Sequence, residues 1–170
     1  VYKRQGNLLI NDGVIAAKGA LVYGLNDAAR TIDCAGVYIA PGIIDIGVKV
    51  CEPGERHKES FKSAGLAAAA GGITTIVTRP DTLPAIDTPE TLEFIHRRAM
   101  EASVVNVLPM AALTKGREGR EMTEIGFLQD AGAVGFTDCD SVVFDVKILI
   151  CSLCYARSLG AWVMGHPQDP

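Results

Sequence analysis

Side chains that can bind metals or carry charge lie directly after apolar stretches of this chain. The stretch at 42–50 carries Lys49, and two later stretches end at Asp138 with Cys139 and at His166. Cysteine, histidine and carboxylate side chains are common zinc ligands. Two or three such ligands on separate loops are thin evidence for a zinc site, so we favour structural roles for these side chains.

The elements that must position these residues alternate along the chain. Amphipathic stretches typical of helices occupy 57–70, 88–102, 122–132 and 145–160, and apolar stretches typical of strands occupy 42–50, 73–78, 105–112, 133–138 and 161–166. Apolar strands separated by amphipathic helices are typical of a parallel sheet covered by crossover helices. The sequence therefore predicts the α/β class.

A barrel is favoured over an open sheet that binds dinucleotides. The turn after the first of these strands reads "KVCEPGERH" and lacks the G-x-G-x-x-G pattern of a dinucleotide site. In a β/α barrel, functional residues lie on the loops that follow the carboxyl ends of the strands. Those ends fall here at 45–51, 78–81, 111–115, 137–140 and 166–169.

The first 39 residues have a different pattern. The stretch "LLINDGVIAA" predicts a hairpin around Asp12 and Gly13. We assign residues 1–39 to a β-rich segment of a small β-sandwich and residues 40–170 to the first half of a barrel. Because the chain begins without Met and stops after a predicted strand, we expect a fragment whose sheet has an exposed apolar edge.

The composition is that of a globular protein, with 48% hydrophobic and 21% charged residues. The net charge of −4 excludes a broad surface for nucleic acid. We find neither a signal peptide nor a membrane span, and therefore expect a cytoplasmic protein without a membrane partner. The odd number of cysteines indicates reduced thiols, and Cys151 and Cys154 fall in a helical pattern that favours packing.

Several stretches in the same order resemble the dihydroorotase family of the amidohydrolase superfamily: "APGIIDIGVKVCEPGERHKES", "TRPDT", "VGFTD" and "GHPQDP". The resemblance covers residues 36–170. It implies a partial (β/α)8 TIM barrel of the amidohydrolase type and the interconversion of carbamoyl aspartate and dihydroorotate in pyrimidine biosynthesis. The family's chemistry uses a metal-bound hydroxide, because the metal lowers the pKa of bound water and polarises the carbonyl.

The positions that hold the metal in this family carry different residues here. The family's H-x-H pair falls on Gly47 and Lys49, and its metal-bridging carboxylate falls on Cys139. Glycine offers no ligand, and a protonated lysine repels a cation. Of the family's ligands within this span only His166 remains, and it is a weak metal candidate.

The substrate-binding positions differ as well. The family's carboxylate-binding Arg falls on Cys51, and the Asn of its M-P-N-T run falls on Asp81. Asp81 adds a negative charge that would repel an anionic substrate. Arg79 compensates for this charge only if it turns inward.

Lys49 has two interpretations. Its ammonium either substitutes for the charge of the missing ion, held near Asp45 or Asp138, or extends into solvent. Burying an unpaired ammonium is costly, so the exposed lysine is favoured.

These replacements predict a pseudoenzyme with no catalytic residues and no cofactor, which acts as an assembly partner of aspartate transcarbamoylase. A homo-oligomer is left open. The alternative is an active zinc-dependent cyclic amidohydrolase with divergent ligands that include Cys139 and His166. A small-molecule binding protein on a degenerate barrel ranks lowest.

Overall fold

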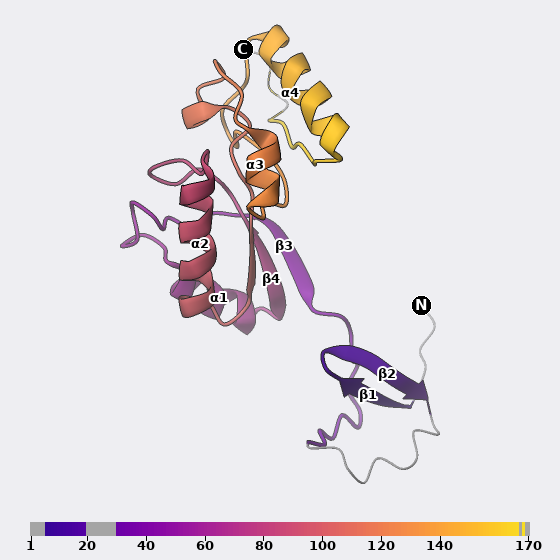
Figure 1. The fold of residues 1–170 in the computed structure, drawn as a ribbon. Coiled ribbons are helices and arrows are strands. Elements are labelled where there is room, and N and C mark those ends of the chain that lie inside the picture. The colour runs from indigo at the N-terminus through magenta and orange to yellow at the C-terminus, as the bar shows by residue number, and fades with distance from the viewer. Residues whose placement is uncertain (1–5, 20–29, 167, 169–170) are drawn as a thin grey trace. The chain divides into compact units, whose positions relative to one another are not determined.

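The computed structural model describes residues 6–19, 30–166 and 168 of the chain (Figure 1). These residues fall into two compact units, one within residues 1–40 and the other within 41–170. The assignment of the first unit to a β-sandwich stays a prediction.

A short antiparallel hairpin lies in the first unit. It joins β1 (Asn7–Asn11) to β2 (Val14–Gly19). Asp12 and Gly13 have φ values of 49° and 77°, and a tight two-residue hairpin turn requires positive values. The predicted hairpin is therefore confirmed. Residues 20–29 of the predicted β-rich segment lie outside the described residues, and residues 30–40 contain no strand.

Three parallel strands form the sheet of the second unit, in the order β3-β4-β5. They are β3 (Ile43–Val48), β4 (Ile73–Thr78) and β5 (Asn106–Pro109). A helix lies between each pair of consecutive strands, as parallel pairing requires. The carboxyl ends of the strands therefore meet at one edge of the sheet.

The strands predicted at 133–138 and 161–166 are reduced to isolated contacts. Phe136 joins the segment after β5 on one side and Val163 on the other through single parallel bridges. The chain leaves this ladder at Cys139, whose φ of 57° interrupts an extended conformation. The predicted order of the segments is retained, although their predicted length as strands is wrong.

In the part of the chain that the structure describes, four α-helices accompany the sheet, and each lies within a predicted stretch. They are α1 (Phe61–Ala70), α2 (Pro89–Ala102), α3 (Ile125–Asp130) and α4 (Val146–Leu159). α1 begins later than predicted because Ser60 and Ser63 form a reciprocal capping box. α2 begins as predicted, with Thr88 as its N-cap and Pro89 in its first turn. None of the helices in the described residues is long and apolar enough to cross a membrane.

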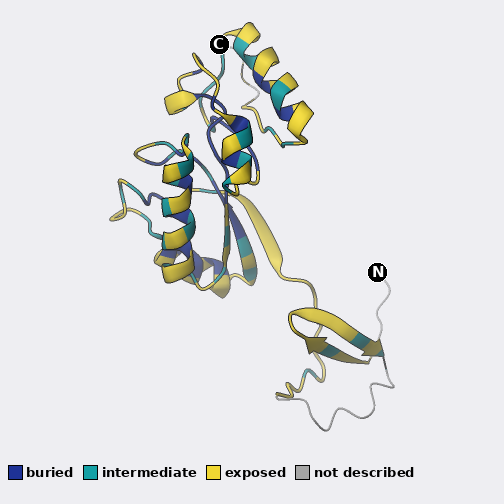
Figure 2. Cartoon of the chain, in the orientation of Figure 1, coloured by how far each residue is buried: buried dark blue, intermediate teal, exposed yellow. Residues whose placement is uncertain are grey.

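A core lies between the sheet and the helices α1 and α2 (Figure 2). Its largest members are at most 1% exposed and include Phe61, Ile76, Leu92, Ile95 and Phe136. Ile76 lies on β4, so the face of β4 that carries Ile76 is covered by helices. By contrast, β3 is exposed along its length, with Ile43, Ile44 and Ile46 57%, 61% and 63% exposed. β3 forms the predicted apolar edge of the described sheet.

Glu52 anchors the loop after β3 to both of these helices. Its side chain is only 5% exposed. The carboxylate accepts hydrogen bonds from the backbone nitrogen of Phe61 at 3.2 Å and from Nε of Arg98 at 3.0 Å. Phe61 begins α1 and Arg98 lies on α2, so the loop that follows the site residues of β3 is held in place.

Replacing Phe136 with Leu should lower the free energy of unfolding by about 1 kcal/mol. The smaller side chain would leave unfilled space where the fully buried ring of Phe136 packs. Urea denaturation followed by circular dichroism measures the change. Phe127→Leu is the matched control, since the Phe127 ring on α3 is 65% exposed. That control should change stability by less than about 0.5 kcal/mol. Equal losses in the two variants would contradict the described core.

Candidate functional site

β3 contains one more residue than β4 near the edge where the strands end. Ile46 pairs with Val77 and Val48 pairs with Thr78, which leaves Gly47 without a partner on β4. This arrangement is a β-bulge. Gly47 has a φ of 90°, a conformation that residues with side chains rarely adopt.

The bulge reverses the alternation of side chains along β3. Asp45 pairs with Ile76, and Val48 pairs with Thr78. Ile76 and Thr78 are two residues apart on β4 and so point to the same face of the sheet. Asp45 and Val48 therefore share that face. Lys49 directly follows Val48, and continued alternation places it on the face opposite to Asp45.

Lys49 forms a salt bridge with Asp81, with 2.9 Å between Nζ and Oδ2. The side chain of Lys49 is 55% exposed, whereas that of Asp81 is only 4% exposed. The structure thus differs from both interpretations of Lys49 that the sequence offered. The partner is Asp81 rather than Asp45 or Asp138, and the ammonium is paired rather than free in solvent.

Arg79 completes a group of four charged residues, Lys49, Arg79, Asp81 and Asp140, which we call the charge cluster. The Arg79 guanidinium donates to Oδ1 and Oδ2 of Asp81 at 3.2 and 3.0 Å, and to Oδ2 of Asp140 at 2.7 Å. Arg79 therefore turns inward, and two cations balance two carboxylates. Asp81 is not the free negative charge that the sequence predicts.

The charge cluster keeps its members ionised. Burial opposes ionisation of Asp81, but the hydrogen bond from Lys49 and the charge of Arg79 outweigh it and lower the pKa of Asp81. The hydrogen bond to Asp81 raises the pKa of Lys49, and the hydrogen bond from Arg79 lowers the pKa of Asp140. Lys49 is therefore protonated near neutral pH and has no lone pair for a metal.

Asp138 organises the loop after β5. Its carboxylate accepts hydrogen bonds from the backbone nitrogens of Leu113 and Thr114, at 2.9 and 3.0 Å, and from the Thr114 hydroxyl. Arg117 donates to the backbone carbonyl of Asp138 at 3.1 and 3.2 Å. Asp138 is 4% exposed, and these donors use most of the acceptor capacity of its carboxylate.

The residues at the positions where the family resemblance implies metal ligands are a poor fit for a zinc ion. Burial, together with the charge of Asp81, raises the pKa of Cys139, so forming the thiolate that binds zinc is less favourable here than for a free cysteine. His166 is exposed, and its Nε2 lies 2.9 Å from Oε1 of Gln168. Gly47 has no side-chain donor. No group of three His, Cys, Asp or Glu residues that could hold a metal occurs in residues 6–19, 30–166 and 168.

Sequence reasoning missed two features of this site. The bulge at Gly47 depends on the register between β3 and β4, which a single strand does not reveal. Asp140 was also missed as a partner of Arg79. The second feature had a signal, because an acidic residue at a strand end is a natural partner for an arginine at the neighbouring end. Cys51, where the resemblance implies a substrate-binding Arg, lies in the loop that follows β3 and is 8% exposed.

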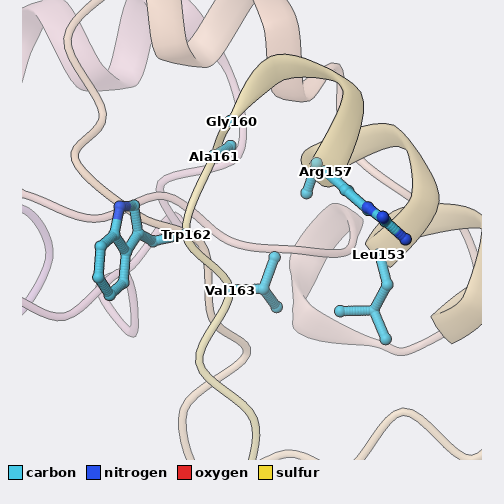
Figure 3. Close-up of a pocket in the computed structure, with 7 residues that line it drawn as sticks. Leu153, Arg157, Gly160, Ala161, Trp162 and Val163 are labelled. Carbon is cyan, nitrogen blue, oxygen red and sulfur yellow. The ribbon is translucent and has the colours of Figure 1, made fainter.

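A concave surface lies beside α4 (Figure 3). It is lined by Leu153, Ala156, Arg157, Gly160, Ala161, Trp162 and Val163. Figure 3 shows Trp162 and Val163 on opposite sides of the extended chain that follows the helix. Arg157 is the charged member of this lining, and one cation without an acid or nucleophile beside it supports no catalytic function.

The second unit consists of parallel βα units with polar residues at the carboxyl ends of the strands, as in β/α barrels. Among solved structures, the chain is similar to the L-hydantoinase (dihydropyrimidinase) from Arthrobacter aurescens, with a TM-score of 0.82 and 25% sequence identity. The match covers 96% of this chain and 37% of that chain. The chain is therefore part of an amidohydrolase-type barrel, which confirms the predicted fold class.

Residues 36–168 match the family described as dihydro-orotase-like, and the chain belongs to this family. A dihydroorotase of Wolbachia sp. subsp. Drosophila simulans is 39% identical over 165 residues, which are 97% of this chain and 37% of the relative. A dihydroorotase of Sulfurihydrogenibium sp. is 45% identical over 140 residues, which are 82% of this chain and 33% of the relative. The chain thus spans about a third of the length of these relatives.

Asp81→Asn should lower the free energy of unfolding at pH 7 by about 1–3 kcal/mol, since two cations lose a buried ionised partner. The unfolded chain binds a proton at Asp81 more readily than the folded chain, because folding lowers this pKa. The stabilisation is therefore present above the ordinary aspartate pKa, about 3.9, and is lost as the pH falls through the lower pKa of the folded chain.

Urea denaturation of both proteins between pH 7 and pH 2.5 measures this effect, and the difference between them should shrink in acid. Asp45→Asn is the control, because Asp45 is exposed and lies on the other face of β3. It should change stability at pH 7 by less than about 0.5 kcal/mol. A wild-type advantage that persists unchanged at pH 2.5 would argue against the charged pairing.

Proposed function

We propose that this chain is a non-catalytic member of the dihydroorotase-like family that acts as a cytoplasmic assembly partner of aspartate transcarbamoylase in pyrimidine biosynthesis. The observation that carries the proposal is the engagement of the charged groups at the strand ends. Asp81 and Asp140 bind Lys49 and Arg79, and Asp138 binds its own loop. Carboxylates that are engaged in this way would bind a metal ion only by giving up these partners.

The metal positions support the same proposal. An amide carbonyl is a poor electrophile, and this family's chemistry relies on a metal to activate both water and carbonyl. Lys49 brings a positive charge to one former ligand position, and Gly47 brings no ligand to another. A divalent cation beside Lys49 would be repelled, and it would compete with Lys49 for Asp81.

The substrate positions support it independently. A guanidinium at position 51 would bind a carboxylate through two parallel hydrogen bonds, whereas the thiol of Cys51 cannot form such a pair of hydrogen bonds. Lys49, two residues before this position in the sequence, is already paired with Asp81. Arg79 binds two carboxylates of the chain itself. An anionic substrate such as carbamoyl aspartate would have to displace these internal partners.

An active zinc-dependent cyclic amidohydrolase is the second candidate. It is favoured by the names of the relatives, which are dihydroorotases at 39% and 45% identity. In that case Cys139 and His166 would act with ligands from outside these 170 residues. The partner role in the first proposal rests on the resemblance to inactive homologues that accompany the transcarbamoylase.

Metal analysis and an activity assay separate the two candidates. The protein, purified in its natural full reading frame from zinc-supplemented cells, should contain less than about 0.1 zinc per chain, since a structural or catalytic site would retain a full ion. It should not cyclise carbamoyl aspartate above the rate without protein. The Sulfurihydrogenibium dihydroorotase is the assay control. One or two zinc ions per chain together with cyclisation would replace the first proposal by the second.

Co-expression tests the partner role. Aspartate transcarbamoylase from the same organism should elute with this protein as one larger species in size-exclusion chromatography with light scattering. Each protein expressed alone is the control, and the protein alone also reports whether it forms a homo-oligomer. Separate elution at micromolar concentration, with unchanged transcarbamoylase assembly, would contradict the partner role.

A further inference from the structure

We propose that Gly47 is a positioning residue: the bulge that it forms directs Lys49 to Asp81, so that the charge cluster joins the ends of three neighbouring segments of the sheet. This role concerns the backbone and goes beyond the loss of a metal ligand at position 47. It requires neither a transcarbamoylase partner nor the absence of catalysis. Its test therefore stands apart from the tests of the proposed function.

The backbone conformation, rather than lack of space, accounts for glycine at this position. The φ of Gly47 is 90°. A Cβ atom built on Gly47 would meet no atom within 4 Å, so a side chain would have room. The strain of that φ is what excludes other residues, because a Cβ destabilises a left-handed conformation.

The bulge determines which face of the sheet Lys49 occupies. In an uninterrupted strand, residues 45, 47 and 49 would point to one face. The extra residue at Gly47 puts Lys49 on the face opposite to Asp45, beside the chain that continues from β4 into Arg79 and Asp81. The backbone nitrogen of Arg79 donates to the Val48 carbonyl at 3.0 Å, so the strands remain joined directly after the bulge.

The charge cluster links three segments through this geometry. Lys49 follows β3, Arg79 and Asp81 follow β4, and Asp140 follows the segment that bridges through Phe136. Asp81 is 4% exposed and accepts from both cations, so it is the central member. If Lys49 lay on the other face of β3, Asp81 would keep only Arg79, and β3 would lose its side-chain link to the other two segments.

A triple-mutant cycle on the full chain tests this inference. Urea denaturation gives the unfolding constant of each variant. The coupling is the factor by which the effect of Lys49→Met on this constant changes when Asp81→Asn is also present. It is measured first in the wild-type background and then in the Gly47→Ala background. The expected coupling is about fivefold in the wild type and near onefold with Gly47→Ala. An undiminished coupling with Gly47→Ala would overturn the inference.

Gly72→Ala is the matched control for backbone strain. Gly72 has a φ of 77°, and a Cβ atom there would also meet no atom within 4 Å. This control should destabilise the protein yet preserve the coupling between Lys49 and Asp81. Gly47→Asn should preserve part of it, because asparagine tolerates positive φ better than alanine. A coupling that disappears equally in Gly72→Ala would also overturn the inference.

A measurement on the folded protein covers the case in which Gly47→Ala unfolds too readily for the cycle. The rate of acetylation of Lys49 by acetic anhydride, followed by mass spectrometry, reports whether the amine is paired. Asp81→Asn should raise this rate, and Gly47→Ala should raise it to the same level, while Gly72→Ala should leave it unchanged. A wild-type rate in Gly47→Ala would overturn the inference.

Discussion

A buried carboxylate needs a positive partner, and the end of this sheet depends on how Asp81 obtains one. Its side chain is 4% exposed and is bound by both Lys49 and Arg79. An ionised carboxylate buried without such partners would cost several kcal/mol or would take up a proton. Because the two cations follow different strands, neutralising this one charge also determines how the strand ends are held together.

The same pairing determines which charged groups at the strand ends are available to bind a ligand. Arg79 binds two carboxylates, and Asp138 accepts hydrogen bonds from the loop after β5. These groups satisfy one another within the chain, so a metal ion or an anionic substrate would have to displace an internal partner. The proposed non-catalytic role is consistent with this pairing of the charged groups within the chain.

The scaffold of this chain follows the family's fold more closely than its strand ends follow the residues that the family resemblance implies. The parallel order of the strands, the capped helices and the buried anchor at Glu52 form a coherent barrel segment. The differences lie at the carboxyl ends of the strands, on loops that a barrel can vary without losing its core. Membership of a family of named dihydroorotases therefore establishes the fold more firmly than the activity.

The sequence by itself determined the order and class of the elements, whereas the positions at which the site departs from its family stay a prediction. Local signals carry that information: apolar periodicity along the strands, the turn at Asp12 and Gly13, and the helix start at Thr88. Tertiary structure alone decided that Lys49 binds Asp81 instead of Asp45, and that the segment at 133–138 is held by single bridges. The reason is that these contacts depend on the register between strands distant in sequence, and one extra residue at Gly47 is enough to move a side chain to the other face.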